Sequence, residues 1–272
     1  MVKEFQSSHK SETDKNNWAI ILGGSSGLGL ATAQKLAKHG YQICIVHRNR
    51  KSELELIEQE FNLITEQGVQ LLTFNADAFK VEIRTQIIEQ LKEKLGDNGR
   101  VKVLIHSVAK GNLKPMISND RPALKNDDFH LTLDAMAISL YDWTKAIYDY
   151  KLFASDTRII SFTSEGNTKA WRNYAAVSAA KAAMEAITRN IALEFSPFGI
   201  RANCIQAGVT DTASLRAIPG SEKIKEHSLL RNPFHRLTTP EDVANAVYLL
   251  CKDEAAWING CVIPVDGGEH LS

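Results

Sequence analysis

Short apolar runs alternate with longer amphipathic stretches from residue 18 to the C-terminus. Such runs are typical of strands buried on both faces, and the stretches between them carry apolar residues at helical spacing. The predicted strands cover residues 18–22, 41–46, 69–74, 101–105, 158–162, 201–205 and 261–265. Strands that alternate with helices form a parallel sheet with right-handed crossovers. We therefore predict the α/β class, with one doubly wound parallel sheet flanked by helices on both faces.

Local signals mark the starts of two predicted helices. Ser52 and Glu55 have the spacing of a capping box, which predicts a helix that begins after Ser52. Thr239 and Pro240 suit the N-cap and the first helical position, since a proline there sacrifices no hydrogen bond. This second pair predicts the start of the last long helix.

The two ends of the chain differ in character. Residues 1–17 are polar and mixed in charge, without the apolar core of a signal peptide, so we expect a disordered N-terminal tail. Residues 18–272 show no linker and no short repeat, which predicts a single domain. No apolar segment approaches the ~20 residues that a membrane span needs, so we expect a cytoplasmic protein without membrane contact.

Composition excludes several kinds of site. The 32 basic and 32 acidic residues balance, and this lacks the basic surplus of a nucleic-acid-binding protein, so that class is excluded. The eight histidines show no metal-ligand spacing, and no metal site is expected. The cysteines sit in apolar runs without paired spacing, which predicts buried free thiols. They are Cys44, Cys204, Cys251 and Cys261.

A glycine-rich turn between the first predicted strand and helix is the first candidate site. Gly-x3-Gly-x-Gly permits a tight turn and lets a pyrophosphate approach the amides of a helix N-terminus. The pattern follows a strand and opens a helix, the context of a dinucleotide site, although a purely structural turn is the alternative. The candidate cofactor-binding residues here are Gly23, Ser25, Ser26, Gly27, Leu28 and Gly29.

The segment after the second predicted strand favours NADPH over NADH. An NAD site would offer an acidic residue there to the adenosine ribose, whereas this chain has the basic run 47–51. Arg48 and Arg50 suit charge-assisted hydrogen bonds to a 2′-phosphate, which a carboxylate would repel. A solvated basic loop is the alternative. After the third strand, Asp77 and Ala78 are placed to hold the adenine edge.

A tyrosine and a lysine separated by six residues form the second candidate site. Seven residues of helix advance the chain by about 10 Å, nearly two turns, so Tyr174 and Lys181 are expected on one face where both reach one ligand. An amphipathic helix with a packed tyrosine and an exposed lysine is the alternative. Ser164, after the fifth strand, either donates to a substrate carbonyl or caps the strand end.

Together these motifs resemble the short-chain dehydrogenase/reductase superfamily from about residue 18 to the C-terminus, and within it the enoyl-acyl-carrier-protein reductases. The run 106–109, His-Ser-Val-Ala, is similar to the His-Ser-Ile-Ala run of those reductases. The Tyr-x6-Lys spacing is theirs, whereas ordinary relatives have Tyr-x3-Lys, which would need a tyrosine at Val177. The resemblance implies a Rossmann-type sheet. It adds to the cofactor site Tyr174, Lys181, Ser107, Val108, Ala109, Gly208, Val209, Thr210 and Thr212.

The segment 174–185 is similar to the divergent, NADPH-preferring branch of these reductases. Ser164 supports this, because the main enoyl reductases have Tyr or Phe ten residues before the catalytic tyrosine. Ser164 also lies 17 residues before Lys181, where ketone-reducing relatives keep a catalytic serine. The asparagine that binds a water in many relatives has no evident counterpart in 134–140, which puts a proton relay through it in doubt.

The resemblance implies NADPH-dependent reduction of the trans-2 double bond of an enoyl thioester in fatty acid synthesis. Tyr174 would donate to the developing enolate oxygen, and Lys181 would bind the nicotinamide ribose. Residues 213–236 occupy the position of the substrate lid. Their basic and apolar residues suit an acyl chain on an acidic carrier protein, although coenzyme A or a plain solvated helix pair also fits. The alanine-rich run 175–186 fits the homotetramer that the family implies.

Two other functions remain open at this stage. A ketone or 3-oxoacyl thioester reductase of the same superfamily is supported by Ser164 and opposed by Val177. A non-catalytic NADP(H)-binding sensor is opposed by the presence of both Tyr174 and Lys181.

Overall fold

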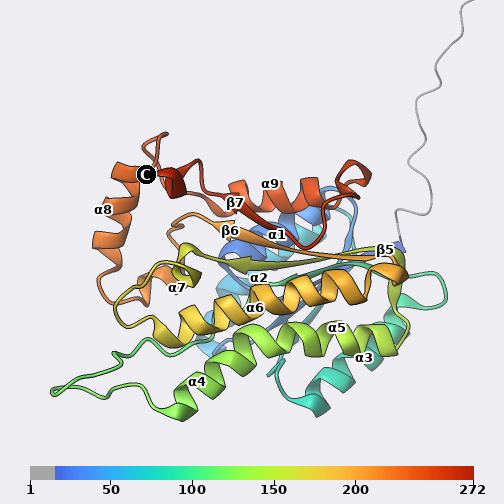
Figure 1. Cartoon of the computed structure of the whole chain (residues 1–272). Coiled ribbons are helices and arrows are strands. Elements are labelled where there is room, and N and C mark those ends of the chain that lie inside the picture. The colour runs from blue at the N-terminus through green and yellow to red at the C-terminus, as the bar shows by residue number, and fades with distance from the viewer. Residues whose placement is uncertain (1–15) are drawn as a thin grey trace, which may run out of the picture.

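Seven parallel strands form one sheet in the computed structural model, which describes residues 16–272 (Figure 1). The order is β3-β2-β1-β4-β5-β6-β7, so the chain winds outward from β1 in both directions. The strands are β1 Asn17–Leu22, β2 Gln42–His47, β3 Leu71–Asn75, β4 Arg100–His106, β5 Phe153–Thr163, β6 Ile200–Ala207 and β7 Val262–Val265. The predicted doubly wound, Rossmann-type α/β fold is confirmed.

Helices cover both faces of this sheet, in two layers that Figure 1 shows above and below it. One apolar core lies between the sheet and α1, α2 and α9, and the other lies between the sheet and α3, α5 and α6. The helices are α1 Gly27–Lys38, α2 Leu54–Thr65, α3 Val81–Leu95, α4 Asn126–Leu133, α5 Ser139–Asp149, α6 Ala175–Glu194, α7 Ala213–Arg216, α8 Ser221–Arg231 and α9 Pro240–Leu250.

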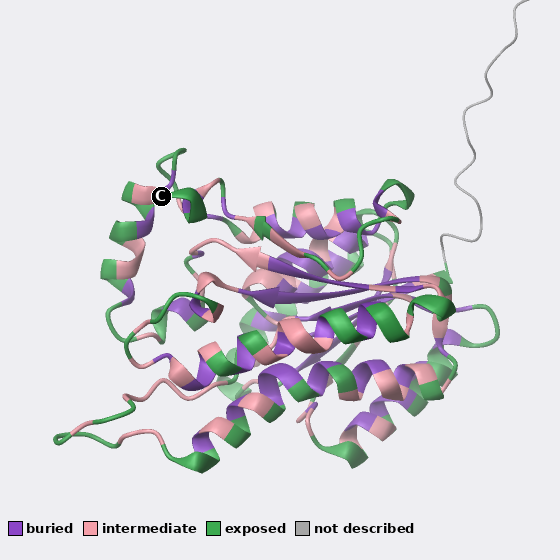
Figure 2. Cartoon of the chain, viewed as in Figure 1, coloured by how far each residue is buried: buried purple, intermediate pink, exposed green. Residues whose placement is uncertain are grey.

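The apolar runs become strands because both of their faces are covered. In β1, Ile20 points into one core and Ile21 into the other, and both are fully buried. The strands in the middle of the sheet are therefore buried along most of their length, as Figure 2 shows. A continuous apolar run is the pattern that such a two-sided environment requires.

Several predicted boundaries shift in the structure. β1 begins at Asn17, one residue inside the predicted tail, and residues 1–15 of that tail lie outside the described residues. β5 begins at Phe153, earlier than predicted, because Phe153 pairs with Val101 of β4 although the residues between are polar. The predicted N-cap at Thr239 is confirmed, since its hydroxyl accepts a hydrogen bond from the Asp242 amide at 3.2 Å.

The predicted capping box at Ser52 and Glu55 is wrong. A 3₁₀ turn, Lys51–Glu53, precedes α2, and the carboxylate of Glu53 accepts the Arg50 amide at 2.9 Å. This bond satisfies one of the donors at the start of the turn, so the serine hydroxyl is not needed.

Three of the four cysteines are buried free thiols, as predicted, but Cys261 is exposed. It directly precedes β7, the edge strand of the sheet, so its apolar neighbours do not guarantee burial. Within residues 16–272, no group of His, Cys, Asp or Glu side chains is arranged to hold a metal ion. The helices of the same residues are all too short or too polar to cross a membrane.

Two segments lie beyond the edge of the sheet at which its strands end. Residues 107–125 run as a long loop from β4 to α4, drawn in green in Figure 1, and α7 and α8 follow β6. Gly111 lets the loop lie close to α6, because a Cβ there would come within 2.6 Å of Val177. Long loops without regular structure are commonly functional, and this one borders the pocket described next.

Candidate active site

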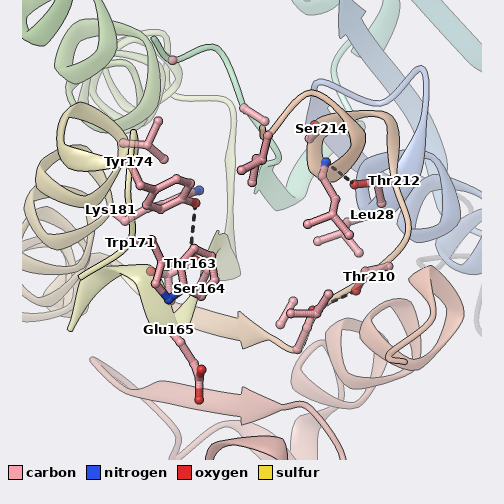
Figure 3. A pocket seen from close by; sticks show the side chains of 18 of the residues that line it. Leu28, Thr163, Ser164, Glu165, Trp171, Tyr174, Lys181, Thr210, Thr212 and Ser214 are labelled. Atoms are coloured by element: carbon pink, nitrogen blue, oxygen red, sulfur yellow. Dashed lines mark hydrogen bonds between the residues drawn. The ribbon is translucent and has the colours of Figure 1, made fainter. Parts of the chain in front are cut away.

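A largely apolar pocket lies at the carboxyl edge of the sheet, where β1, β4, β5 and β6 end (Figure 3). Tyr174 and Lys181 come from one wall, and Leu28 and Thr212 come from the opposite wall. The α7 segment and the loop 107–125 close the sides. Ligands of open α/β folds bind at this edge, so the pocket is the candidate substrate site.

The glycine-rich turn brings a helix N-terminus to this edge. Gly23 has a φ of +83°, and a Cβ there would lie 2.2 Å from the Ser107 carbonyl oxygen. A Cβ on Gly29 would similarly lie 2.3 Å from the Gly23 carbonyl oxygen. These two glycines thus allow the tight turn that the sequence predicts, and Gly23 also allows the turn to pack against the backbone after β4. Gly27, with a φ of +54°, faces the Thr212 side chain across the pocket edge.

The start of α1 has the features of an anion site. Ser26 is the N-cap residue, but its side chain caps no amide, and the first turn holds no acidic residue. The predicted residues Ser25, Ser26 and Leu28 lie at this helix start. Its amides and positive dipole end suit a pyrophosphate, and the missing side chains leave room for one.

Two of the four residues predicted to contact the adenosine end, Arg48 and Asp77, interact with each other. Arg48, after β2, donates to Asp77, after β3, at 2.9 Å. Arg48 and Arg50 are both exposed. Ala78 is buried and its carbonyl oxygen accepts from the Trp143 indole at 3.0 Å, which leaves Asp77 as the more accessible of the two predicted adenine contacts.

The run 106–109 continues β4 into the pocket. The Ser107 amide donates to Leu22 at 2.9 Å, Val108 packs into the cores, and Ala109 lines the pocket. His106 is buried with Nε2 2.8 Å from Ser139 Oγ. Burial, with the Lys181 charge adding, lowers the pKa of His106 to about 3, so this side chain is neutral at physiological pH.

The segment 134–140 contains a local irregularity that the sequence did not indicate. Asp134–Ile138 form a π-helical turn between α4 and α5. Ser139 donates to the Ala135 carbonyl within this turn at 2.7 Å, so His106 must donate to Ser139. Such turns often occur at functional sites, and Met136 from this one lines the pocket.

Tyr174 does not lie within the helix, contrary to prediction. It is the N-cap residue of α6, and only Lys181 lies inside the helix. Asn173 has a left-handed φ of 64°, so the helix cannot continue back through it. Even so, Tyr174, Val177 and Lys181 all line the pocket.

Tyr174 faces Ser164 across the pocket wall, with Oη 3.4 Å from the serine Oγ. Ser164 caps nothing with its side chain, so of its two predicted roles the structure favours the one in the pocket. Burial raises the pKa of the Tyr174 phenol, and the Ser164 hydrogen bond opposes this. The phenol is therefore protonated at physiological pH and can donate.

Lys181 is buried and donates to the Phe162 carbonyl at the end of β5. The predicted alternative of an exposed lysine is therefore wrong. Burial lowers the pKa of Lys181 to about 8, while the nearby Cys204 and Glu185 oppose the change.

The loop after β6 makes several internal hydrogen bonds. Val209 uses both backbone groups, since its amide donates to Glu269 at 3.2 Å and its carbonyl accepts from Thr238 at 3.1 Å. Thr212 is the N-cap of α7 and accepts from the Leu215 amide at 3.3 Å. Gly208 is a packing requirement, because a Cβ would lie 2.3 Å from Thr238 Oγ1. Thr210, also predicted, lines the pocket with Gly208, Val209 and Thr212.

A partly buried ion pair beside the pocket had no signal in the sequence. Arg231, the last residue of α8, donates to both carboxylate oxygens of Glu165 at 2.8 and 3.0 Å, and to the Glu269 carbonyl at 2.8 Å. The Arg231 pair holds the pKa of the Glu165 carboxyl below its usual range, against the effect of burial. The partners lie 66 residues apart in sequence, and no local pattern could have indicated the pair.

The residues present fit a nicotinamide dinucleotide. The uncapped start of α1 suits the pyrophosphate. Arg48 and Arg50, after β2, lie where the adenosine ribose would bind, and Lys181 and Tyr174 line the pocket where the nicotinamide would bind. The strand order places these groups along one edge, from β2 to β6.

This arrangement of sheet, glycine turn and Tyr–Lys pair is that of the short-chain dehydrogenases/reductases, and the chain is an NAD(P)-dependent oxidoreductase of that superfamily. It belongs to the family described as enoyl-(acyl carrier protein) reductase, whose model matches residues 23–270.

Known proteins similar to this chain cover nearly all of it. The peroxisomal 2,4-dienoyl-CoA reductase of Rattus norvegicus is 26% identical over 255 residues, which are 93% of this chain and 84% of that protein. The acetoacetyl-CoA reductase of Allochromatium vinosum is 25% identical, over 92% of this chain and 97% of that one. The crystal structure of enoyl-[acyl-carrier-protein] reductase (NADH) from Aquifex aeolicus superposes with a TM-score of 0.79 at 25% identity, covering 96% and 98% of the two chains.

Proposed function

We propose that the protein reduces the trans-2 double bond of enoyl thioesters with NADPH. The observation that carries this proposal is the arrangement along α6, where Val177 is an apolar part of the pocket wall between Tyr174 and Lys181. A ketone reductase of this superfamily would need its phenol at position 177. Here the phenol stands one turn earlier, and the position that would hold it in a ketone reductase is apolar.

The chain's own residues supply a donor where negative charge develops. Reduction at the β-carbon of an unsaturated thioester places charge on the thioester oxygen, and a preorganised donor there stabilises the transition state more than the substrate. Tyr174 is buried, protonated and aimed into the pocket, so we assign it this role. Bound NADPH would supply the hydride, and Lys181, within the same wall, would bind its ribose hydroxyls.

The preference for NADPH over NADH rests on Arg48 and Arg50. Both are exposed after β2, and the run 47–51 contains no acidic residue that could bind a free ribose hydroxyl pair. Arg48 already pairs with Asp77, but that pair is partly exposed, and a 2′-phosphate with two charges could replace the carboxylate. The proposed preference differs from that of the Aquifex aeolicus protein, which is described as an NADH enzyme.

The substrate that we propose is an acyl chain carried by acyl carrier protein. Leu113, Met136, Leu215 and Ile218 give the pocket its apolar walls, which suit an acyl chain. Lys223 of α8 lines a hollow that shares Trp171 and Ile218 with the pocket, and Arg216 of α7 is exposed. Both basic side chains suit an acidic carrier. Fatty acid synthesis in the cytoplasm is the corresponding setting.

Reduction of a ketone or 3-oxoacyl thioester is the second candidate. The 3.4 Å approach of Ser164 Oγ to Tyr174 Oη favours it, because two hydroxyls could then bind one carbonyl oxygen. The similarity to an acetoacetyl-CoA reductase agrees with it.

The test measures NADPH oxidation with crotonyl and acetoacetyl thioesters side by side, with NADH in parallel. We expect turnover of the crotonyl thioester, and a higher kcat/KM with NADPH than with NADH. Tyr174→Phe keeps the ring but removes the donor, and should lower kcat by about 10²-fold with cofactor affinity nearly unchanged.

Ser164→Ala separates the two candidates, since it should affect enoyl reduction only slightly but ketone reduction strongly. Full enoyl activity of Tyr174→Phe, or turnover of the acetoacetyl thioester alone, would contradict the proposal. If the protein binds NADPH but no thioester causes NADPH oxidation, the result would instead indicate the non-catalytic sensor.

A further inference from the structure

Glu185 lies on α6 one turn beyond Lys181, and its partners are in the segment 163–167. That segment follows β5 and carries Ser164 and the 3₁₀ turn Glu165–Asn167. Glu185 Oε1 accepts from the Thr163 hydroxyl at 2.5 Å and also from the Asn167 side-chain amide. One carboxylate oxygen therefore holds both ends of a five-residue segment.

The residues between these two bonds touch the catalytic phenol. Gly166 lies flat against Tyr174, because a Cβ on Gly166 would come within 2.4 Å of the ring atom Cε1. Ser164 Oγ lies 3.4 Å from Tyr174 Oη. The segment 163–167 is thus one wall of the slot that contains the ring, and the position of that wall determines where the phenol points.

The other contacts of Tyr174 do not fix the hydroxyl as closely. Tyr174 is the N-cap of α6, so it lacks the rigidity of a residue inside the helix. Trp171 packs against the ring with the planes tilted by 50° and the centroids 5.2 Å apart. Met136, Val177 and Ala180 lie in the same apolar cluster as the ring, and their side chains have no polar group that could bond to the hydroxyl.

We infer that Glu185 is a positioning residue, which holds Thr163 and Asn167 so that the backbone of the segment 163–167, with Gly166 against the ring, fixes the Tyr174 phenol at the reacting oxygen. The inference rests on the proposed function for the identity of that oxygen, but the tether itself is a property of the fold. Hydrogen bonds to a carboxylate are strong, and a displacement of about 1 Å at a catalytic donor can cost 10²-fold in rate.

The experiment compares Glu185→Ala with Glu185→Gln. The glutamine oxygen can still accept from Thr163 and Asn167, whereas alanine accepts neither. We expect Glu185→Ala to lower kcat by about 10- to 100-fold with KM changed less than about 3-fold, and Glu185→Gln to stay within about 5-fold of the wild type. Assays at about pH 6.5 keep Lys181 protonated, because its pKa is about 8.

A matched control and a second variant make the result specific. Glu93→Ala removes an exposed glutamate of α3, far from the pocket, and should leave kcat unchanged. Thr163→Val removes one of the two hydrogen bonds to Glu185, so alone it should lower kcat. Added to Glu185→Ala, which has already lost that bond, it should lower kcat by less than a further factor of about 2. If Glu185→Ala does not fold, Thr163→Val and Asn167→Ala carry the test, and each must lower kcat more than KM rises.

Hydrogen exchange gives a readout that needs no substrate. The Asn167 and Thr168 amides donate to Ser164 and Glu165 within the turn, and their protection should fall in Glu185→Ala and persist in Glu185→Gln. Unchanged exchange in Glu185→Ala overturns the inference whatever the substrate is. The inference is also overturned if Glu185→Gln is as slow as Glu185→Ala, because the loss of activity would then come from the loss of the negative charge. A wild type inactive on all thioesters would instead count against the proposed function.

Discussion

The ammonium group of Lys181 is buried, and this burial lowers the free energy of unfolding by an amount that depends on pH. Its pKa falls from 10.5 to about 8 in the fold, so between these values the unfolded chain binds more protons than the folded one. Stability contributed by this group therefore rises as the pH rises from about 8 to 10.5. The full effect is on the order of 3 kcal/mol.

We predict that Lys181→Met, which keeps the length of the side chain without its charge, is relatively more stable than the wild type near pH 7. Its advantage should shrink by about 2 kcal/mol near pH 9.5, where the wild-type lysine is largely neutral in the fold. Urea unfolding of both proteins without cofactor at the two pH values measures this difference. The same difference at both values would show that Lys181 is not held as a buried cation.

The sequence predicted which residues reach the pocket better than it predicted what their polar atoms bond to. Tyr174 and Lys181 meet there as their spacing indicates, yet the ammonium of Lys181 is turned toward the Phe162 carbonyl. That carbonyl belongs to a strand end, and its position depends on the whole sheet. Glu185 was visible in the sequence only as one more helix residue, because its partners are 18 and 22 residues away.

At the level of elements, the Arg231 ion pair connects α8 to the turn that follows β5. Arg231 bridges Glu165 and the C-terminal turn, and both charged groups are largely buried. Removing one partner of such a pair leaves the other charge without compensation, which costs several kcal/mol in a fully buried site and less here.

Arg231→Met should therefore loosen the contact of α8 with the pocket wall at Glu165. We expect KM for the thioester to rise about 10-fold with a smaller change in kcat, and the melting temperature to fall by a few degrees. Lys145→Met is the matched control on α5, because its pair with Asp149 is exposed and contributes little. Equal effects of the two substitutions would rule out a special role for the Arg231 pair.

The predicted element boundaries succeeded where a local pattern determines them. Thr239 and Pro240 start α9 because the capping bonds join residues three positions apart. Ser52 failed because the neighbouring Glu53 offers a stronger acceptor to the same turn. The π-helical turn 134–138 has no glycine or proline to indicate it, and it joins α4 to α5 beside the pocket.

For the whole molecule, we propose a homotetramer that packs through the outer face of α6. The alanines of α6 divide between two faces, with Ala176 and Ala180 buried in the chain and Ala179 and Ala182 exposed. Large apolar side chains are exposed on or beside the same layer, including Tyr141 and Leu193. Small residues allow close helix packing, and the apolar surface near them would be covered by another copy.

Light scattering at micromolar concentration should give a mass near four times the 30.2 kDa of one chain. Ala182→Arg places a long charged side chain on that face, so we expect smaller species with the fold retained by circular dichroism. Leu56→Arg, an equally drastic change at an exposed residue of α2, should leave the mass unchanged. A monomer in the wild type would refute the assembly.

The contact between Gly166 and the Tyr174 ring also has a consequence for how relatives can be sorted. A side chain at position 166 would clash with a phenol ring at position 174, so the two positions should vary together during evolution. Proteins that share the Tyr-x6-Lys spacing should keep glycine eight residues before the tyrosine. Relatives with the phenol one turn later should tolerate other residues there. This pairing of two positions offers a simple sequence marker for separating the two kinds of reductase.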